Sequence, residues 1–446
     1  MAAAMLLSAY AAPQKTQETV PAETAAPATT EAQETAAPEA VPGETVPANY
    51  TAKKKTTLEY FGTASMLCMY GDFTAEGETK RAEATWTKIK EMLSSLDNLL
   101  STTIPDSEIS RFNALKYGES MAISPVTAEV WQLSMGLYAR TNGIFNPAMY
   151  PLIDLWAFSP RYIYSSEKVE AYDRERADGA FALPDEAYID AFLKLADPEN
   201  ILLSGSDAEG WTLTKNVPAV TVNGVTYEAK IDLGGIVKGY ATDLAEQLLR
   251  EDGWPYAYFS CGTSSMCMLK SASANAIKKN VPDYVLGIRA PRENESGLYA
   301  SVAIRDESLS SSGDYENNYS LDGQLYCHII DPRTGRPLNV GEARPQRGIS
   351  TVTLMSGSAT EDDALTTALC LMGPEEAIRF FNAELKGRDM LMVLYSADSD
   401  TYEVVTNLGA DRMSLMEEAY VLASETDAEG NIRYTGKLFP ELSKEN

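Results

Sequence analysis

The chain has 446 residues, 44% of them hydrophobic, which is enough for one large or two medium domains with a substantial core. Its 37 Lys and Arg against 64 Asp and Glu give a net charge of −27, which repels a phosphate backbone and an anionic membrane surface, so we expect no nucleic-acid partner. An anionic ligand would have to be held by backbone dipoles, a few placed cations or a divalent metal ion. The five cysteines form no C-x-x-C pair, which indicates buried free thiols rather than a zinc site or a disulfide framework.

The first fifty residues differ in composition from the rest. Residues 1–12 resemble the tail of a secretory signal without its basic region, and Leu7-Ser8-Ala9 is similar to the run before the lipidated cysteine of bacterial lipoproteins, but position 10 is Tyr. Residues 13–50 are rich in Ala, Thr, Glu and Pro without apolar periodicity, which predicts a disordered acidic linker. We therefore predict an exported protein whose native form carries a membrane tether. The alternative is a cytoplasmic protein with a disordered tail.

Residues 51–446 alternate strand and helix patterns, which predicts one α+β unit with two lobes, mixed or antiparallel sheets and packed helices. The first expected elements are a strand at 58–72 in which Gly62 permits a bend, a helix at 82–101 with one apolar face, and a helix at 126–143 closed by Gly143 at C′. Residues 159–215 are charged and irregular, with a helix near 185–196 and a hairpin around 201–214. Further strands are expected at 218–232, 256–260, 284–289 and 300–305.

The stretch IDLGGIVKGYATDLAEQLL, residues 231–249, reads as a strand end, a glycine turn and an amphipathic helix. Its turn could present backbone N–H groups to a phosphate at the helix N-terminus. The glycines at 234, 235 and 239 do not match the dinucleotide pattern G-x-G-x-x-G. Local pattern alone leaves two readings open, a phosphate site and an ordinary tight turn.

Two later segments contain more polar and titratable groups than packing requires. Residues 310–319 (SSSGDYENNY) predict a loop whose hydroxyl and N–H groups could hold a phosphate or a ribose, or else a plain hairpin loop. Residues 326–338 predict a strand running into a turn at 331–335. This segment holds the only histidine, His328, which is either a structural residue or a group for proton transfer near neutral pH.

A third segment, residues 350–373, predicts a strand, a polar turn and a helix from about Thr360. Asp363 and Thr367 are four residues apart and therefore lie on one helical face. A carboxylate and a hydroxyl, completed by a backbone carbonyl and ligand phosphates, suit Mg²⁺. The alternative is a capping box of Thr360 with Asp363, which explains the acidic cluster through the helix dipole.

Seven segments, in this order, together resemble the ApbE family, the FAD:protein FMN transferases or flavin transferases. The resemblance covers nearly all of residues 55–410, and its H-x-x-D-P-x-T-G and D-L-G-G-x-x-K-G patterns are specific. The segments are FGT near 61, SEISRFN at 107–113, GIFNPAMYPLIDLWAF at 143–158, IDLGGIVKGYATD at 231–243, SSGDY at 311–315, HIIDPRTGRP at 328–337 and DALTTAL at 363–369.

The resemblance implies that residues 51–446 are an ApbE-like domain that binds FAD with Mg²⁺ and splits its pyrophosphate. It also implies a location in the periplasm or on the extracytoplasmic face of the bacterial cell membrane. The FMN half would move onto a threonine hydroxyl of an acceptor protein as a phosphoester, with release of AMP. Acceptors in similar systems are subunits of membrane electron-transfer complexes or extracellular reductases. One alternative is an FAD pyrophosphatase that gives FMN and AMP, and two others are a non-catalytic FAD-binding surface lipoprotein and an acidic surface adhesin.

The resemblance also implies roles for individual positions. His328 would be the base that takes the threonine proton or would position the phosphate, and Asp331 would orient it or shape the turn. Two positions depart from the family pattern: Phe61 stands where methionine is common, and Trp-Ala-Phe stands in place of Trp-Gly-Phe. These changes would affect the shape of the pocket more than the activity. The Mg²⁺ ligands would be Asp363, which is also counted as catalytic, Thr367 and the carbonyl of Gly235. The FAD-binding positions would be Phe61, Trp156, Ala157, Phe158, Asp232, Lys238, Gly313 and Asp314.

Overall fold

The computed structural model describes residues 47, 49–159, 183–270, 284–291, 297–304, 306–321, 324–338, 347–396 and 400–444. The predicted signal remnant, nearly all of the predicted linker and residues 160–182 of the charged stretch lie outside this described part. Within it, no helix combines the length and the apolar character that crossing a bilayer requires. All five cysteines are buried and free, which confirms the prediction of buried thiols.

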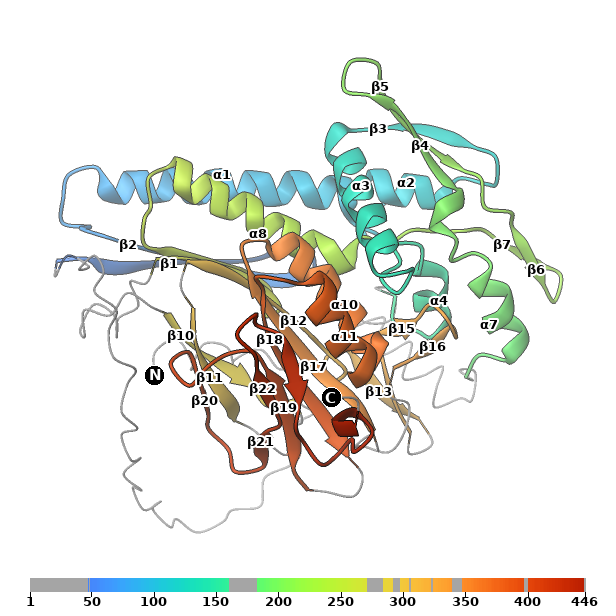
Figure 1. The fold of residues 1–446 in the computed structure, drawn as a ribbon. Helices are drawn as coiled ribbons and strands as arrows, with labels where there is room; N and C mark the ends of the chain where they lie inside the picture. The colour runs from blue at the N-terminus through green and yellow to red at the C-terminus, as the bar shows by residue number, and fades with distance from the viewer. Residues whose placement is uncertain are drawn as a thin grey trace, which may run out of the picture.

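A nine-stranded sheet forms the centre of the molecule (Figure 1). Neighbouring strands of this sheet are antiparallel, except for the last two, which are parallel to each other. This confirms the expected mixed and mainly antiparallel sheet. In spatial order the strands are β1 (Thr51–Tyr60), β2 (Thr63–Gly71), β8 (Ala257–Cys261), β9 (Ser265–Leu269), β12 (Glu307–Gly313), β17 (Arg347–Ser356), β18 (Asp389–Ser396), β19 (Tyr402–Thr406) and β21 (Tyr420–Leu422).

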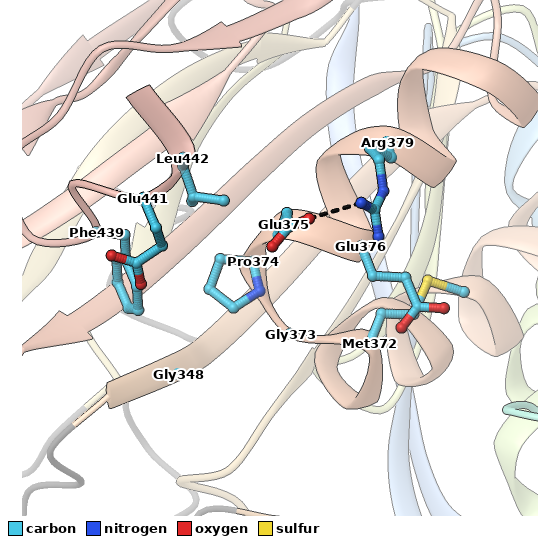
Figure 2. Close-up of a pocket in the computed structure, with 10 residues that line it drawn as sticks. All are labelled: Gly348, Met372, Gly373, Pro374, Glu375, Glu376, Arg379, Phe439, Glu441 and Leu442. Atoms are coloured by element: carbon cyan, nitrogen blue, oxygen red, sulfur yellow. Dashed lines mark hydrogen bonds and ion pairs between the residues drawn. The ribbon is translucent and has the colours of Figure 1, made fainter. Parts of the chain in front are cut away.

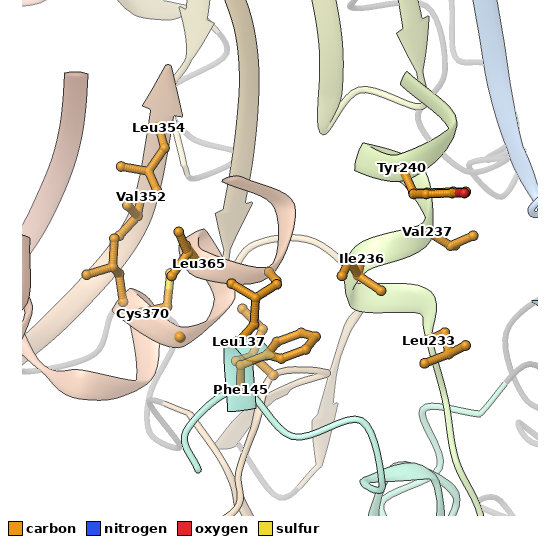
Figure 3. Close-up of a cluster of buried hydrophobic side chains, with 14 of the residues drawn as sticks. Leu137, Phe145, Leu233, Ile236, Val237, Tyr240, Val352, Leu354, Leu365 and Cys370 are labelled. Carbon is orange, nitrogen blue, oxygen red and sulfur yellow. The ribbon is translucent and has the colours of Figure 1, made fainter. Parts of the chain in front are cut away.

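Helices cover one face of this sheet. They are α1 (Glu78–Leu100), α8 (Gly234–Glu251), α10 (Ala359–Met372) and α11 (Pro374–Glu384). Figure 3 shows part of the core between them, with Val352 and Leu354 of β17, Leu365 and Cys370 of α10 and Ile236 of α8. Burying each large apolar side chain stabilises the fold by about 1.5–3 kcal/mol, so this layer fixes how α8 and α10 lie on the sheet.

The opposite face of the sheet carries a second core. Along β2, Leu67 belongs to the first core and the next residue, Cys68, to the second, as the alternation of side chains in a strand requires. A three-stranded sheet covers this face. In the core between the two sheets, Tyr299 stacks on Tyr420 and Tyr420 on Tyr402, at centroid distances of 4.7 and 4.8 Å. The strands of this smaller sheet are β10 (Tyr284–Arg289), β11 (Leu298–Ile304) and β20 (Met413–Leu415).

A second group of elements lies beyond the start of α8, which agrees with the expected two lobes (Figure 1). Its helices are α2 (Glu108–Ala114), α3 (Pro125–Arg140), α4 (Tyr150–Leu155), α7 (Glu186–Leu193) and the 3₁₀ turn η1 (Pro198–Asn200). Its strands are β3 (Ser120–Ile123), β4 (Ile201–Ser206), β5 (Gly210–Lys215), β6 (Val220–Val222) and β7 (Val225–Tyr227). The boundary at residue 51 and the single-domain division stay predictions.

The remaining elements are short. Two of the hairpins follow β12 and carry the predicted histidine segment, while the third closes the C-terminal part of the chain. They are β13 (Asn318–Leu321) with β14 (Gln324–Cys327), β15 (Ile330–Asp331) with β16 (Arg336–Pro337), β22 (Ser424–Thr426) with β23 (Ile432–Tyr434), and the 3₁₀ turn η2 (Leu442–Lys444).

The single strand predicted at 58–72 is wrong, because the chain reverses within it. Phe61 and Gly62 have φ values of 54° and 61°, and the flanking residues Tyr60 and Thr63 pair with each other. Two central residues with positive φ match the twist of a two-residue hairpin, so β1 and β2 are separate antiparallel strands. The strand predicted at 218–232 is likewise the short hairpin of β6 and β7, followed by irregular chain.

The end of α3 differs by one residue from the prediction. Asn142, with φ 52°, occupies C′, and Gly143, with φ 82°, occupies C″. The Gly143 amide donates to the carbonyl of Tyr138 at 2.8 Å and the Asn142 amide to that of Ala139 at 3.2 Å, which is the Schellman pattern. The predicted helices at 82–101 and 185–196 and the strand at 284–289 are confirmed.

Candidate active site

The glycine turn before α8 is held by polar contacts on both sides. The Asp232 carboxylate accepts from the Gly234 amide at 2.8 Å, and the Asp232 amide donates to the carbonyl of Pro147 at 2.9 Å. The Asn113 side chain pairs with both backbone groups of Ile231, at 2.8 and 2.9 Å. The start of α8 is therefore a fixed helix N-terminus, and such an end attracts anions.

Helix α10 brings Asp363 against α8. The buried Asp363 carboxylate accepts from the Gly239 amide at 3.0 Å, and the Lys238 ammonium lies 3.9 Å from the same oxygen. A Cβ on Gly239 would lie 2.2 Å from the carbonyl oxygen of Ala359, so only glycine permits this approach of the two helices. Burial raises the pKa of Asp363, and the Lys238 ammonium opposes that shift.

Strand β12 carries hydroxyls to the underside of α10. The Ser312 hydroxyl lies 3.1 Å from that of Thr367 and 2.9 Å from that of Thr366, and the Ser310 hydroxyl donates to the Ala359 carbonyl at 3.3 Å. The loop predicted at 310–319 is therefore wrong for residues 310–313, which lie in the middle of the main sheet.

Gly313 and Asp314 follow directly. A Cβ on Gly313 would come within 2.4 Å of the Tyr315 ring. The Asp314 carboxylate is buried and accepts from the hydroxyls of Tyr395 at 2.9 Å and Ser350 at 3.3 Å. These protein contacts account for the burial of Asp314, and its predicted role in FAD binding stays a prediction.

His328 lies half-buried in the segment between β14 and β15. Within the described residues its Nδ1 atom is buried and has no hydrogen-bond partner. Burial, and then the positive charge of Lys238, lowers the pKa of His328 to about 4. The imidazole is therefore neutral at neutral pH, and its environment includes the cation that also faces Asp363.

Asp331 shapes the turn after His328. Its carboxylate accepts from the Arg333 guanidinium at 2.8 and 2.9 Å, and its carbonyl accepts from the amides of Thr334 and Gly335. Arg333 also donates to the Leu371 carbonyl near the end of α10 at 2.5 Å. Of the two predicted roles of Asp331, these contacts support turn formation, because its carboxylate is engaged by Arg333.

The Trp156-Ala157-Phe158 run ends α4 and joins an aromatic stack. The Trp156 indole N–H donates to the Gly335 carbonyl at 2.7 Å. The rings follow one another as Phe158, Tyr319, Tyr326 and Trp156, with centroid distances of 5.1, 5.3 and 5.8 Å. The two tyrosines, which were not predicted as site residues, are directly opposite each other in the pairing of β13 with β14. Phe61 lies far from these aromatic residues in the sequence. It is in the turn between β1 and β2, where its backbone amide hydrogen-bonds to the Asp97 carboxylate.

The residues predicted for Mg²⁺ fit a hard cation. The described residues contain no group of three or more His, Cys, Asp or Glu side chains that could hold a metal. The predicted donors are instead all oxygens, from the Asp363 carboxylate, the Thr367 hydroxyl and the carbonyl of Gly235 in the first turn of α8. One carboxylate with two neutral oxygens leaves coordination positions for ligand phosphates, as Mg²⁺ sites in phosphate-handling proteins require.

A pocket of about 470 Å³ lies elsewhere, where α10 meets α11 (Figure 2). Met372, Pro374 and Phe439 give it apolar walls, while Glu375 pairs with Arg379 at 2.6 Å at its rim. None of the predicted site residues lines it. It therefore plays no part in the site described above.

Comparison with solved structures defines the class of fold. The chain is similar to a structure of the flavin transferase ApbE from Vibrio cholerae, with a TM-score of 0.59 and 22% identity over 82% of this chain and 97% of that one. It is equally similar to the apo flavinyl transferase ApbE from Pseudomonas stutzeri, with a TM-score of 0.59 and 21% identity over 83% and 96%. The molecule thus has the fold of the ApbE flavin transferases.

Sequence comparison then gives the family. The model of the ApbE family matches residues 61–392, and the chain belongs to this family. The FAD:protein FMN transferase of Escherichia coli K12 is 28% identical over 322 residues, which are 72% of this chain and 80% of the relative. The enzyme of the same name from Vibrio cholerae is 27% identical over 312 residues, 70% and 80% of the two chains. The family resemblance expected from the seven segments is confirmed.

Proposed function

We propose that this protein transfers the FMN half of FAD onto a threonine hydroxyl of an acceptor protein, in a Mg²⁺-dependent reaction that releases AMP. The family of the chain and its curated relatives indicate the general class, which is a flavin transferase. This more specific proposal rests on the contact of the Asp363 carboxylate with Gly239 and Lys238 of α8, because the Lys238 ammonium also binds the Gly234 carbonyl in the first turn of that helix.

In the proposed reaction the threonine oxygen attacks the phosphorus of the FMN half. A new oxygen–phosphorus bond forms, the pyrophosphate bond to the AMP half breaks, and the threonine loses its proton. Asp363, Thr367 and the Gly235 carbonyl would hold Mg²⁺, which when bound neutralises the negative charge that develops on the phosphoryl oxygens. In a chain with a net charge of −27 this neutralisation matters, because the overall field disfavours an anionic substrate.

Lys238 supports the same step with a fixed positive charge. Its ammonium donates to the Gly234 carbonyl at 2.9 Å and lies near Asp363, so it is held at the beginning of α8. The positive end of the helix dipole lies at the same place. We therefore propose that the glycine turn within residues 231–249 is a phosphate site that lacks the dinucleotide fingerprint.

His328 is proposed as the group that accepts the threonine proton or positions the phosphate. A general base must be neutral before the reaction, and the lowered pKa of His328 keeps it neutral above about pH 5. Its buried Nδ1 atom has no hydrogen-bond partner among the described residues, and in this proposal a bound substrate group would supply one.

The flavin ring is proposed to lie against the segment that contains Trp156 and Phe158, with Asp232 and Phe61 as further contacts. The aromatic stack provides an apolar and rigid surface there. We also propose an extracytoplasmic location with a possible membrane tether, and an acceptor in an electron-transfer complex or an extracellular reductase. The competing functions are an FAD pyrophosphatase and an FAD-binding surface lipoprotein without activity.

The deciding experiment incubates the protein with FAD and Mg²⁺, with and without a protein domain that carries a candidate threonine, and follows AMP and covalent flavin fluorescence. Labelled acceptor together with AMP is the expected result. AMP without labelled acceptor would favour the pyrophosphatase, and tight FAD binding with neither product would favour the binding protein. Asp363→Asn is the matched variant, because it keeps the side-chain size and removes the charge that would bind the metal.

A further inference from the structure

Asp243 is the last residue of the conspicuous segment IDLGGIVKGYATD, and none of the roles assigned above uses it. It lies on α8, one helical turn after Gly239, on the side that meets α10. Its carboxylate accepts from the amides of Ala359 at 2.7 Å and Thr360 at 3.0 Å. It also accepts from the hydroxyls of Thr360 at 2.6 Å and Ser358 at 3.2 Å. A side chain on one helix therefore caps the first turn of another.

The alternative raised from the sequence, a capping box of Thr360 with Asp363, is therefore wrong. Helix α10 begins two residues earlier than such a box requires, with Ser358 as N-cap, and the Ser358 hydroxyl accepts from the Glu361 amide at 3.3 Å. Asp243 satisfies the two amides that precede Glu361. Since α10 needs nothing from Asp363 at its N-terminus, the Asp363 carboxylate is free to face α8 and bind the Gly239 amide.

Asp243 and Gly239 connect α8 to α10 at two points that are one turn apart on both helices. The first tie runs from Asp243 to the amides of Ala359 and Thr360, and the second from the Gly239 amide to Asp363. Together they set the rotation and the height of α10 relative to the start of α8. The distance between the Asp363 carboxylate and the Gly235 carbonyl depends on that placement.

We propose that Asp243 is a positioning residue for the flavin-transfer reaction, because its cap on α10 from α8 places the Asp363 carboxylate for Mg²⁺. The inference rests on the proposed function, in which Asp363 serves the metal. Groups that orient a metal ligand without touching the metal typically contribute 10- to 100-fold to metal affinity or activity.

The test compares Asp243→Ala and Asp243→Asn with a control cap elsewhere in the same chain. Glu108 of α2 also lies at the N-terminus of a neighbouring helix, α3, where it accepts from the amide of the N-cap residue Ser124 at 2.9 Å and from the hydroxyls of Ser124 and Thr127. Glu108→Ala therefore removes a helix-end carboxylate far from α10 in the sequence. The Asn variant keeps one acceptor oxygen and should fold even if the Ala variant does not.

Two readouts are needed on the full chain. The first is the Mg²⁺ concentration that gives half-maximal AMP release at saturating FAD. The second, which needs no turnover, is the Mg²⁺-dependent rise in melting temperature with FAD present. We expect Asp243→Ala to shift both curves to roughly 10- to 100-fold higher Mg²⁺, Asp243→Asn to shift them less, and Glu108→Ala to lower the melting temperature without moving either curve.

Equal Mg²⁺ curves for wild type and both Asp243 variants would overturn the inference, as would an equal shift in Glu108→Ala. If the wild type releases no AMP, the proposed function fails, but the melting curves still judge the role of Asp243. A wild type whose melting temperature does not respond to Mg²⁺ would overturn both.

Discussion

Ala157 occupies a backbone position that glycine usually fills. It has φ 61° and is the C′ residue of α4, where its amide donates to the Asp154 carbonyl at 3.1 Å and the Phe158 amide donates to the Ile153 carbonyl at 2.9 Å. A left-handed conformation costs an L-residue about 1–2 kcal/mol. Alanine in place of the glycine of Trp-Gly-Phe therefore strains the backbone at this position.

We predict that Ala157→Gly stabilises the protein by up to about 1 kcal/mol, because the relief of strain exceeds the extra chain entropy of glycine. Urea unfolding measures the change. Ala148→Gly is the control, because Ala148 is also buried but has no positive φ and should lose stability. Destabilisation by both substitutions would mean that the packing of the Ala157 methyl group contributes more to stability than its backbone strain costs.

The lowered pKa of His328 sets a direction for the pH dependence. The folded pKa of about 4 lies below the ordinary value of 6.5, so the unfolded chain binds more protons between these values. The contribution of neutral His328 to stability is therefore fully present above pH 6.5 and is lost as the pH falls towards 4. We predict that His328→Ala flattens the dependence of melting temperature on pH in this window.

The same variant tests the proposed chemistry. We expect His328→Ala to bind FAD nearly as wild type does, measured by quenching of flavin fluorescence, and to transfer FMN much more slowly. In the wild type, protonation of His328 should leave the rate unaffected between pH 6 and 8. Lost FAD binding with unchanged turnover per bound FAD would contradict a role for His328 in the chemical step.

At the scale of the elements, the contact of α8 with α10 depends on Gly239. We predict that Gly239→Ala costs about 1–3 kcal/mol or more, because the added Cβ would overlap the Ala359 carbonyl and force the helices apart. The same change at Gly136 in α3, where a Cβ meets nothing within 4 Å, should instead stabilise by up to about 1 kcal/mol. Thermal unfolding of the two variants gives opposite signs if the close approach is responsible, and equal signs if it is not.

The elements with a strong local signal were predictable from the sequence, and the others depended on pairing. Helix α1 follows from its apolar periodicity alone. Residues 310–313 have the composition of a loop, yet they form a central strand because β9 and β17 hydrogen-bond to both of its edges. The turn at Phe61 was missed because Phe carries no turn signal, and only the pairing of β1 with β2 sets its positive φ.

For the whole molecule, the charge of −27 is the dominant long-range property. Self-repulsion destabilises a compact chain, and salt screens it over about 10 Å at 0.1 M. We predict that raising NaCl from about 0.02 to about 0.3 M, with EDTA present, raises the melting temperature by about 1 °C, the shift that ~1 kcal/mol produces in a domain of this size. A fall would show that surface ion pairs such as Lys55–Glu83, at 2.7 Å, outweigh the repulsion.

The sequence by itself determined the family, the helices with clear periodicity and the common face of Asp363 and Thr367. That face follows from the helical repeat within four residues, so it needs no information from the rest of the chain. The seven ordered segments likewise identify the chain without any knowledge of where they meet.

Only the tertiary structure decided how these residues are used. The amide that binds Asp363 belongs to Gly239, 124 residues away in the chain, and the carboxylate that caps α10 belongs to Asp243, 116 residues from the Ala359 amide that it binds. The environment of His328 includes Lys238, from another part of the chain. Such contacts depend on how the first core orients α8 and α10 on one face of the sheet, and that orientation is a sum of many weak packing terms that no local pattern records.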